Sequence, residues 1–142
     1  MKIDFLWALY YISLNQIKTN LNIDNQESVD CFLKNDVLQI IKFSLNYDDQ
    51  RIQEGALNLL GNLLLGKQQQ NKIVFEKLIE LGVMAKLIQF LNGINRQFRI
   101  LCLRIVNNMV QIEGVTQSVY LQNIFPVLIQ RISQDDSSVK IF

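Results

Sequence analysis

The stretch Gly61-Asn-Leu-Leu-Leu-Gly66-Lys67 has the spacing of a phosphate-binding loop, a glycine followed by four residues and then Gly-Lys. Such a loop joins a strand to a helix, points its backbone N–H groups at phosphates and continues with Ser or Thr, which binds magnesium. Here Gln68 follows Lys67, leucines fill the loop, and the apolar residues upstream recur with a helical period. The stretch therefore predicts a buried helix that runs to about Leu65 and is stopped by Gly66 at its C-terminal cap.

Other residues that could do chemistry are scarce. The chain has no histidine, which removes the commonest general base and the commonest metal ligand. Cys31 and Cys102 lack metal-ligand spacing and are expected to be small buried side chains rather than a disulfide. Most acidic residues stand where helices should start, and there they favour the helix macrodipole; these are Asp24, Glu27, Asp48, Asp49, Asp135 and Asp136. We therefore expect no enzyme activity, no cofactor and no metal.

The composition predicts an ordered chain with one sizeable core, because 49% of its 142 residues are hydrophobic. The 14 Lys and Arg residues nearly balance the 13 Asp and Glu residues, so the bulk charge indicates neither nucleic acid nor an anionic membrane as a partner. The longest apolar run, Phe5–Ile12, is too short to span a bilayer.

The pattern favours helix throughout, and two series of similar stretches recur at intervals of roughly 40–50 residues. In the first series, "KNDVLQIIKF", "ELGVMAKLIQF" and "LQNIFPVLIQR" superimpose with Asn35, Gly82 and Asn123 at the same position. In the second series, "DFLWALYYI", "GALNLLGNL" and "LCLRIVNNM" superimpose with Trp7, Asn58 and Arg104 at the same position. A fourth copy, "DDSSVKIF", matches "DDQRIQEG" and is cut off at the last residue.

One unit reads as a short helix at about 69–81, a corner at Gly82, a second helix at 83–92, a loop around Gly93 and a long third helix at 95–112. Three helices with a glycine corner favour an armadillo unit over the two-helix HEAT unit. The expected fold is all-α, an armadillo-type right-handed superhelical solenoid of about three stacked repeats.

The whole chain, 1–142, is expected to be one armadillo array. It would contain the third helix of one repeat at 2–17, followed by repeats at about 25–66, 68–113 and 115–142, the last of them incomplete. Solenoids need terminal units with a polar outer face, and neither end shows one. We therefore expect a fragment of a longer array, truncated at both ends.

The long helices are apolar nearly all round, so their polar positions are informative. Each helix carries one polar stripe at spacings of three or four residues: Asp4, Trp7, Tyr11 and Asn15; Arg51, Gly55, Asn58 and Asn62; Gln97, Arg104, Asn108 and Gln111. Stacking the helices side by side would join the stripes into a ladder on the concave surface. For any single residue a structural role stays open, because an Asn can cap a helix and a Trp is usually part of a core.

These residues resemble importin-α, the armadillo adaptor of nuclear import, whose third helices carry Trp and Asn four residues apart. "DFLWALYYIS" resembles its fourth repeat, in which Tyr replaces the usual Asn, as Tyr11 does here. "EGALNLLGNLLLGKQQQ" looks like the fifth repeat, which keeps the pair Gly61-Asn62, and "LCLRIVNNMVQ" with "NIFPVLI" looks like the sixth. The resemblance covers almost the whole chain.

The resemblance implies an adaptor of the cytoplasm and nucleus that binds extended basic localisation peptides of cargo proteins. In that family the Trp indoles hold the stems of Lys and Arg, and the Asn amides bind the peptide backbone. Carried over, Trp7, Asn62 and Asn108 would contact the ligand, with Tyr11 and Asp4 in support. The family also engages importin-β, through a basic amino-terminal segment that this sequence lacks.

Two features depart from that pattern. Asn58 and Arg104 occupy positions where an aromatic ring would hold a lysine, and the charge of Arg104 should repel a basic peptide. From Lys86 onward the balance is 6 − 3 = +3, from Lys86, Arg96, Arg99, Arg104, Arg131 and Lys140 against Glu113, Asp135 and Asp136. The alternatives are a generic armadillo scaffold that binds another, acidic partner through Arg99 and Arg104, or an enzyme that uses the Gly61–Lys67 stretch.

Overall fold

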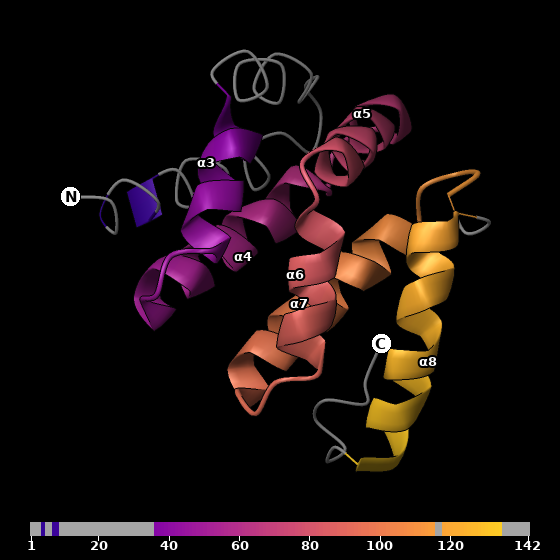
Figure 1. Ribbon diagram of the computed structural model, residues 1–142. Helices are drawn as coiled ribbons and strands as arrows, with labels where there is room; N and C mark the ends of the chain where they lie inside the picture. The colour runs from indigo at the N-terminus through magenta and orange to yellow at the C-terminus, as the bar shows by residue number, and fades with distance from the viewer. Residues whose placement is uncertain (1–3, 5–6, 9–35, 116–117, 135–142) are drawn as a thin grey trace.

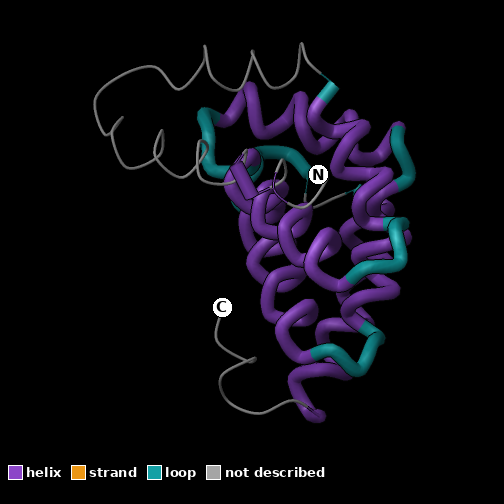
Figure 2. Tube along the Cα trace, turned by 90° about the vertical axis from the view of Figure 1, so that its left-hand side faces the viewer, coloured by secondary structure: helices purple, strands orange, loops and turns teal. Residues whose placement is uncertain are grey.

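The computed structural model describes residues 4, 7–8, 36–115 and 118–134, and all regular secondary structure in these residues is helical. The helices with defined bounds are α3 (Val37–Leu45), α4 (Gln50–Leu63), α5 (Gln68–Glu80), α6 (Val83–Leu91), α7 (Arg96–Val110) and α8 (Val119–Gln134). Short loops join most of them (Figure 2). The all-α prediction is confirmed for this part of the chain.

The helices pack in two layers. The long helices α4 and α7 lie against each other, with α3 packed on α4 and α6 packed on α7. Helix α8 packs against α6, and α5 contacts both α6 and α3. Along the molecule the chain advances from α3 and α4 through α6 and α7 to α8 at the opposite side (Figure 1).

The pair α3–α4 recurs as α6–α7 after 46 residues (82 − 36 and 95 − 49). Asp36 and Gly82 both adopt left-handed backbone, with φ of 54° and 72°, immediately before the short helix. Asp49 and Asn95 both cap the long helix with a side-chain oxygen, accepting from the N–H groups of Arg51 at 2.9 Å and Phe98 at 3.1 Å. The internal repeat is therefore present here, one residue away from the predicted alignment of Asn35 with Gly82.

The predicted equivalence of Asn123 with the corner at Gly82 is wrong. Asn123 is an exposed residue inside α8, which runs without interruption from Val119 to Gln134 and contains Pro126. Residues 119–123 are helical, whereas Gly82 turns the chain with a positive φ. The buried face of α8 still follows the repeat, since Ile124 and Leu128 join the core as Val83 and Leu87 do.

One apolar cluster runs through the described helices and includes fully buried residues of both long helices, such as Leu59, Leu60 and Ile105. Cys102 is buried within it with a free thiol, and burial raises the pKa of that thiol well above its ordinary value. This confirms the prediction of a small buried side chain at Cys102; Cys31 lies outside the described residues. None of the described helices is both long and apolar enough to cross a membrane.

Candidate peptide-binding surface

The Gly61–Lys67 stretch is the end of one helix and the start of the next. Helix α4 ends at Leu63, and the turn that follows leads into α5 at Gln68. The predicted cap at Gly66 is wrong, since the glycines with positive φ in the described residues are Gly82 and Gly114. Helix α4 ends two residues before Leu65, and the turn that follows is held by side-chain hydrogen bonds rather than by a glycine with positive φ.

Asn71 holds that turn. Its Oδ1 accepts from the Gly66 N–H and its Nδ2 donates to the Gly66 carbonyl, both at 3.0 Å. Gln68 stands where a phosphate-binding loop has Ser or Thr, and its side chain instead binds the segment after α7, donating to the Gln111 carbonyl and accepting from the Glu113 N–H, each at 2.9 Å. The side chains of Asn71 and Gln68 therefore hold the turn after α4 and join the two ends of the 68–113 unit.

The predicted polar stripes of α4 and α7 meet at the boundary between these helices. Arg104 donates from Nη2 to Oδ1 of Asn62, and Asn108 donates from Nδ2 to the carbonyl oxygen of Gly61 at 3.0 Å. We refer to Asn58, Asn62, Arg104 and Asn108 as the polar seam. Residues predicted to share a surface from positions about one repeat apart are thus brought together.

Gly61 allows this close approach. A Cβ atom at residue 61 would lie 3.2 Å from Cζ and 3.3 Å from Nε of Arg104, so the guanidinium rests against the backbone of α4. Gly61 also lies in the last turn of α4, where backbone carbonyls lack a partner within the helix and a nearby cation is favourable. The sequence did not predict a role in packing for Gly61. Its position directly before Asn62 is the feature that could have indicated one.

Burial divides the polar seam into two kinds of residue. Asn62 and Asn108 are only 5% and 9% exposed, and their amides make the bonds between helices. Asn58 and Arg104 are half-buried, so part of each side chain faces solvent, although Asn58 also donates to the Glu54 carbonyl of its own helix at 3.0 Å. The groups that a ligand could reach are therefore those of Asn58 and Arg104.

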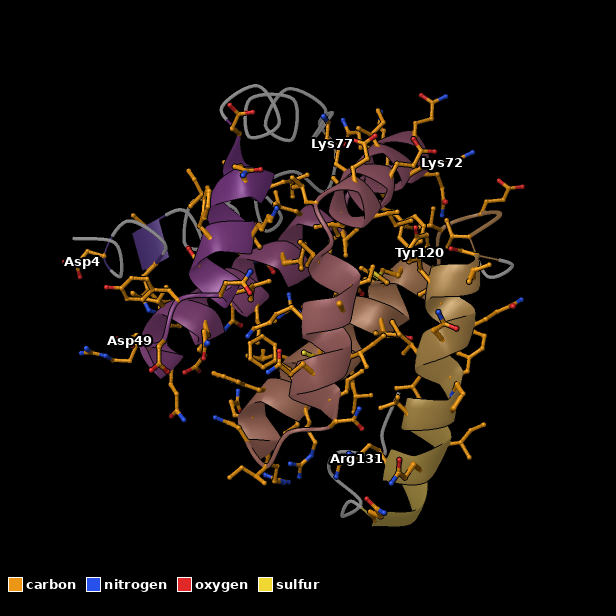
Figure 3. All side chains as sticks on the ribbon, viewed as in Figure 1. Asp4, Asp49, Lys72, Lys77, Tyr120 and Arg131 are labelled. Atoms are coloured by element: carbon orange, nitrogen blue, oxygen red, sulfur yellow. The ribbon has the colours of Figure 1, made fainter. Side chains whose placement is uncertain are left out.

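The first stripe is placed only in part. Trp7 is half-buried and Asp4 is exposed, both in helical backbone, whereas Tyr11 and Asn15 lie outside the described residues. Figure 3 shows Asp4 beside α3 and α4, at the opposite side of the molecule from Arg131 on α8.

The α6–α8 side of the described chain is basic. From Lys86 to Gln134 its only acidic residue is Glu113, against the cations Lys86, Arg96, Arg99, Arg104 and Arg131. Two of these cations bind carbonyls at the end of α6: Arg131 donates from Nε to Leu91 at 2.7 Å and Arg99 donates from Nη1 to Gly93 at 3.0 Å. Arg104 forms no ion pair with any carboxylate of the described residues.

A shallow pocket lies elsewhere, between α3 and α5, and is lined by Asp36, Leu38, Gln39, Lys77, Glu80 and Leu81. It shares no residue with the polar seam. Within the described part of the chain, no group of three or more His, Cys, Asp or Glu side chains could hold a metal ion.

No protein-family model matches this chain, and a search of curated proteins finds no significant match. A functional assignment therefore depends on the helical repeat and on the polar seam.

Proposed function

We propose that the chain is part of an armadillo-type, right-handed solenoid that binds an extended polypeptide across its long helices. Support comes from the helix pair that recurs after 46 residues (82 − 36), with the same corner and the same N-cap position in both copies. A unit that repeats in this way buries its apolar faces against its neighbours, so further units stack along one axis.

The observation that carries the proposal is the meeting of equivalent positions at the α4–α7 boundary. Asn58 and Arg104 occupy the same place in consecutive units, and each keeps part of a polar side chain in solvent. An extended peptide has backbone N–H and C=O groups without partners; an Asn amide can bond to either kind, and an Arg side chain can donate to carbonyls. Equivalent polar groups on successive long helices suit such a ligand.

A nuclear-import adaptor for basic peptides is the second candidate, and the observation that favours it is Trp7. Trp7 is half-buried, so part of the residue remains exposed to solvent. A cation over an indole gains about 0.5–2 kcal/mol. Arg104 weighs against this candidate, because it puts a positive charge where a second basic side chain would bind.

The proposal is tested with labelled oligo-glutamate, oligo-glutamine and oligo-lysine peptides of equal length, each carrying a photo-crosslinker. Binding is followed by fluorescence anisotropy, and the crosslinked residues are mapped by mass spectrometry. We expect crosslinks on α4 and α7 near Asn58 and Arg104, and few on the exposed face of α5 around Lys72, which Figure 3 shows pointing outward. Crosslinks confined to other helices would refute this surface.

The import candidate has its own variant. Trp7→Ala should weaken the oligo-lysine peptide by about 1–2 kcal/mol and leave the oligo-glutamine peptide unchanged. Equal affinities of the wild type and the variant for oligo-lysine would show that Trp7 only packs against its neighbours.

A further inference from the structure

We propose that Arg104 is the specificity-determining residue of the polar seam and that it selects an extended peptide with an acidic side chain. This inference rests on the proposed peptide-binding function and adds the chemistry of the ligand. In this proposal Arg104 binds the carboxylate of a Glu or Asp side chain in the peptide.

The guanidinium of Arg104 is held in place before any ligand arrives. Asn62 accepts from Nη2, and the guanidinium also lies against the backbone at Gly61, where a Cβ would come within 3.2 Å of Cζ. A side chain fixed in this way loses little conformational freedom when it binds, which favours affinity.

Arg104 also has donors to spare. A guanidinium carries five N–H donors, and the bond to Asn62 uses one of them. The residue is half-buried, so part of it remains exposed to solvent. Two N–H groups of a guanidinium match the two oxygens of a carboxylate, and such bidentate pairs are the strongest that a side chain of this kind forms.

The charge of Arg104 is not neutralised nearby. No described carboxylate forms an ion pair with it, and the end of α4, which it contacts at Gly61, carries only about half an elementary charge. The chain from Lys86 to Gln134 adds four further cations and only Glu113 as an acid. This field attracts an acidic peptide and repels a basic one.

A nucleic-acid strand would also be attracted, but the seam suits it less well. Backbone phosphates are usually bound by several cations in a row, and aromatic side chains stack on the bases. Here one arginine stands among asparagines, and Arg99 and Arg131 already donate to the carbonyls of Gly93 and Leu91. A single fixed guanidinium beside amide groups fits a peptide carboxylate.

The experiment compares the oligo-glutamate, oligo-glutamine and oligo-lysine peptides on the wild type and on Arg104→Gln, Arg104→Glu and Arg104→Lys. Lys72→Gln is the matched control, since it removes the same charge from an exposed site on α5. The wild type should bind oligo-glutamate more tightly than oligo-glutamine, and oligo-lysine least. Arg104→Gln should reduce the preference for glutamate over glutamine about tenfold, Arg104→Lys should keep part of it, and Lys72→Gln should keep all of it.

Arg104→Glu should reverse the order and favour oligo-lysine. Circular dichroism of each variant shows whether the fold is retained, and Arg104→Lys, which keeps the charge, serves if Arg104→Gln does not fold. If the wild type binds all three peptides equally, if its preference survives in Arg104→Gln, or if Lys72→Gln reduces the preference as much as Arg104→Gln does, the selection by Arg104 is wrong while the peptide-binding function stands. If no peptide binds, the proposed function itself fails. Tighter binding of a single-stranded oligothymidylate than of oligo-glutamate would overturn the choice of a peptide.

Discussion

Asn108 of α7 donates a buried hydrogen bond from its Nδ2 to the backbone carbonyl of Gly61 on α4, at 3.0 Å. Gly61 lies in the last turn of α4, where the helix itself leaves carbonyls without partners. A side chain of one unit thus completes the hydrogen bonding of the helix in the unit before it. The sequence predicted this Asn as a member of a polar ladder that faces a ligand, and in this structure its amide binds the neighbouring helix.

Asn108→Ala should lower the free energy of unfolding by about 1–3 kcal/mol, because the buried carbonyl of Gly61 loses its partner. Urea denaturation followed by circular dichroism measures the change. The control is Asn107→Ala, a half-buried neighbour on α7 without a side-chain bond to α4, which should change stability by less than about 0.5 kcal/mol. Equal losses in the two variants would contradict the role given to the Asn108 amide.

Gly61→Ala tests the contact between Arg104 and the backbone of α4. Alanine in a helix is favoured over glycine by about 0.5–1 kcal/mol, but here its methyl group would displace the guanidinium. We expect the substitution to be nearly neutral in the wild type and to stabilise an Arg104→Ala background by the full propensity gain. A double-mutant cycle from urea denaturation measures this coupling, and strict additivity would be the disproof.

Gln70 and Asn71 are adjacent buried amides on α5 with opposite expected effects. Within the part of the chain that the structure describes, neither polar atom of the Gln70 side chain has a hydrogen-bond partner, whereas Asn71 makes two bonds to the peptide groups of Gly66. Gln70→Met should therefore raise the free energy of unfolding by about 1 kcal/mol, and Asn71→Ala should lower it by about 1–3 kcal/mol. Thermal and urea unfolding measure both changes in the free energy of unfolding. A clear loss of stability in Gln70→Met would contradict the absence of a partner.

Asp49 should make the stability of α4 depend on pH in acid. The hydrogen bond from the Arg51 side chain, together with that from the Arg51 N–H, lowers the pKa of the Asp49 carboxyl below its ordinary value of 3.8. Because the folded-state pKa is the lower one, the carboxylate stabilises the fold above the unfolded value, and this contribution is lost as the pH falls through the folded value.

The urea midpoints of the wild type and Asp49→Asn, measured across the acid range, test this expectation. They should differ by a constant amount at neutral pH and converge below about pH 4, where the carboxyl of the unfolded chain takes up its proton. A difference that grows as the pH falls would have the wrong sign.

The order of helices in one unit could be predicted from the sequence. The expected segments 69–81, 83–92 and 95–112 correspond to α5, α6 and α7, because the apolar period, the left-handed Gly82 and the Asn95 cap all mark the same boundaries. These signals are local, so a single sequence carries them. The corner at Asn123 was wrong, because the alignment compared side chains and these do not determine the backbone φ: Asp36 adopts a left-handed corner, whereas Asn123 lies inside α8.

The sequence could not predict whether the side chains of the polar seam bond to a ligand or to the neighbouring helix. The spacing placed Asn62, Arg104 and Asn108 on one surface, and the structure brings them together. Whether an amide bonds to a ligand or to the neighbouring helix depends on the distance between helices, which Gly61 reduces. That distance follows from packing of the whole pair and is not encoded in the polar residues themselves.

The matching caps at Asp49 and Asn95 have a consequence for the length of such a chain. They mark the same point in two successive units, so joining residue 49 directly to residue 96 would place α7 immediately after α3, with an acidic cap at its start. The new junction between a short helix, an N-cap residue and a long helix would be of a type that the protein already contains. Excision or duplication of one such block by genetic recombination would therefore shorten or extend the structure without requiring a new kind of junction.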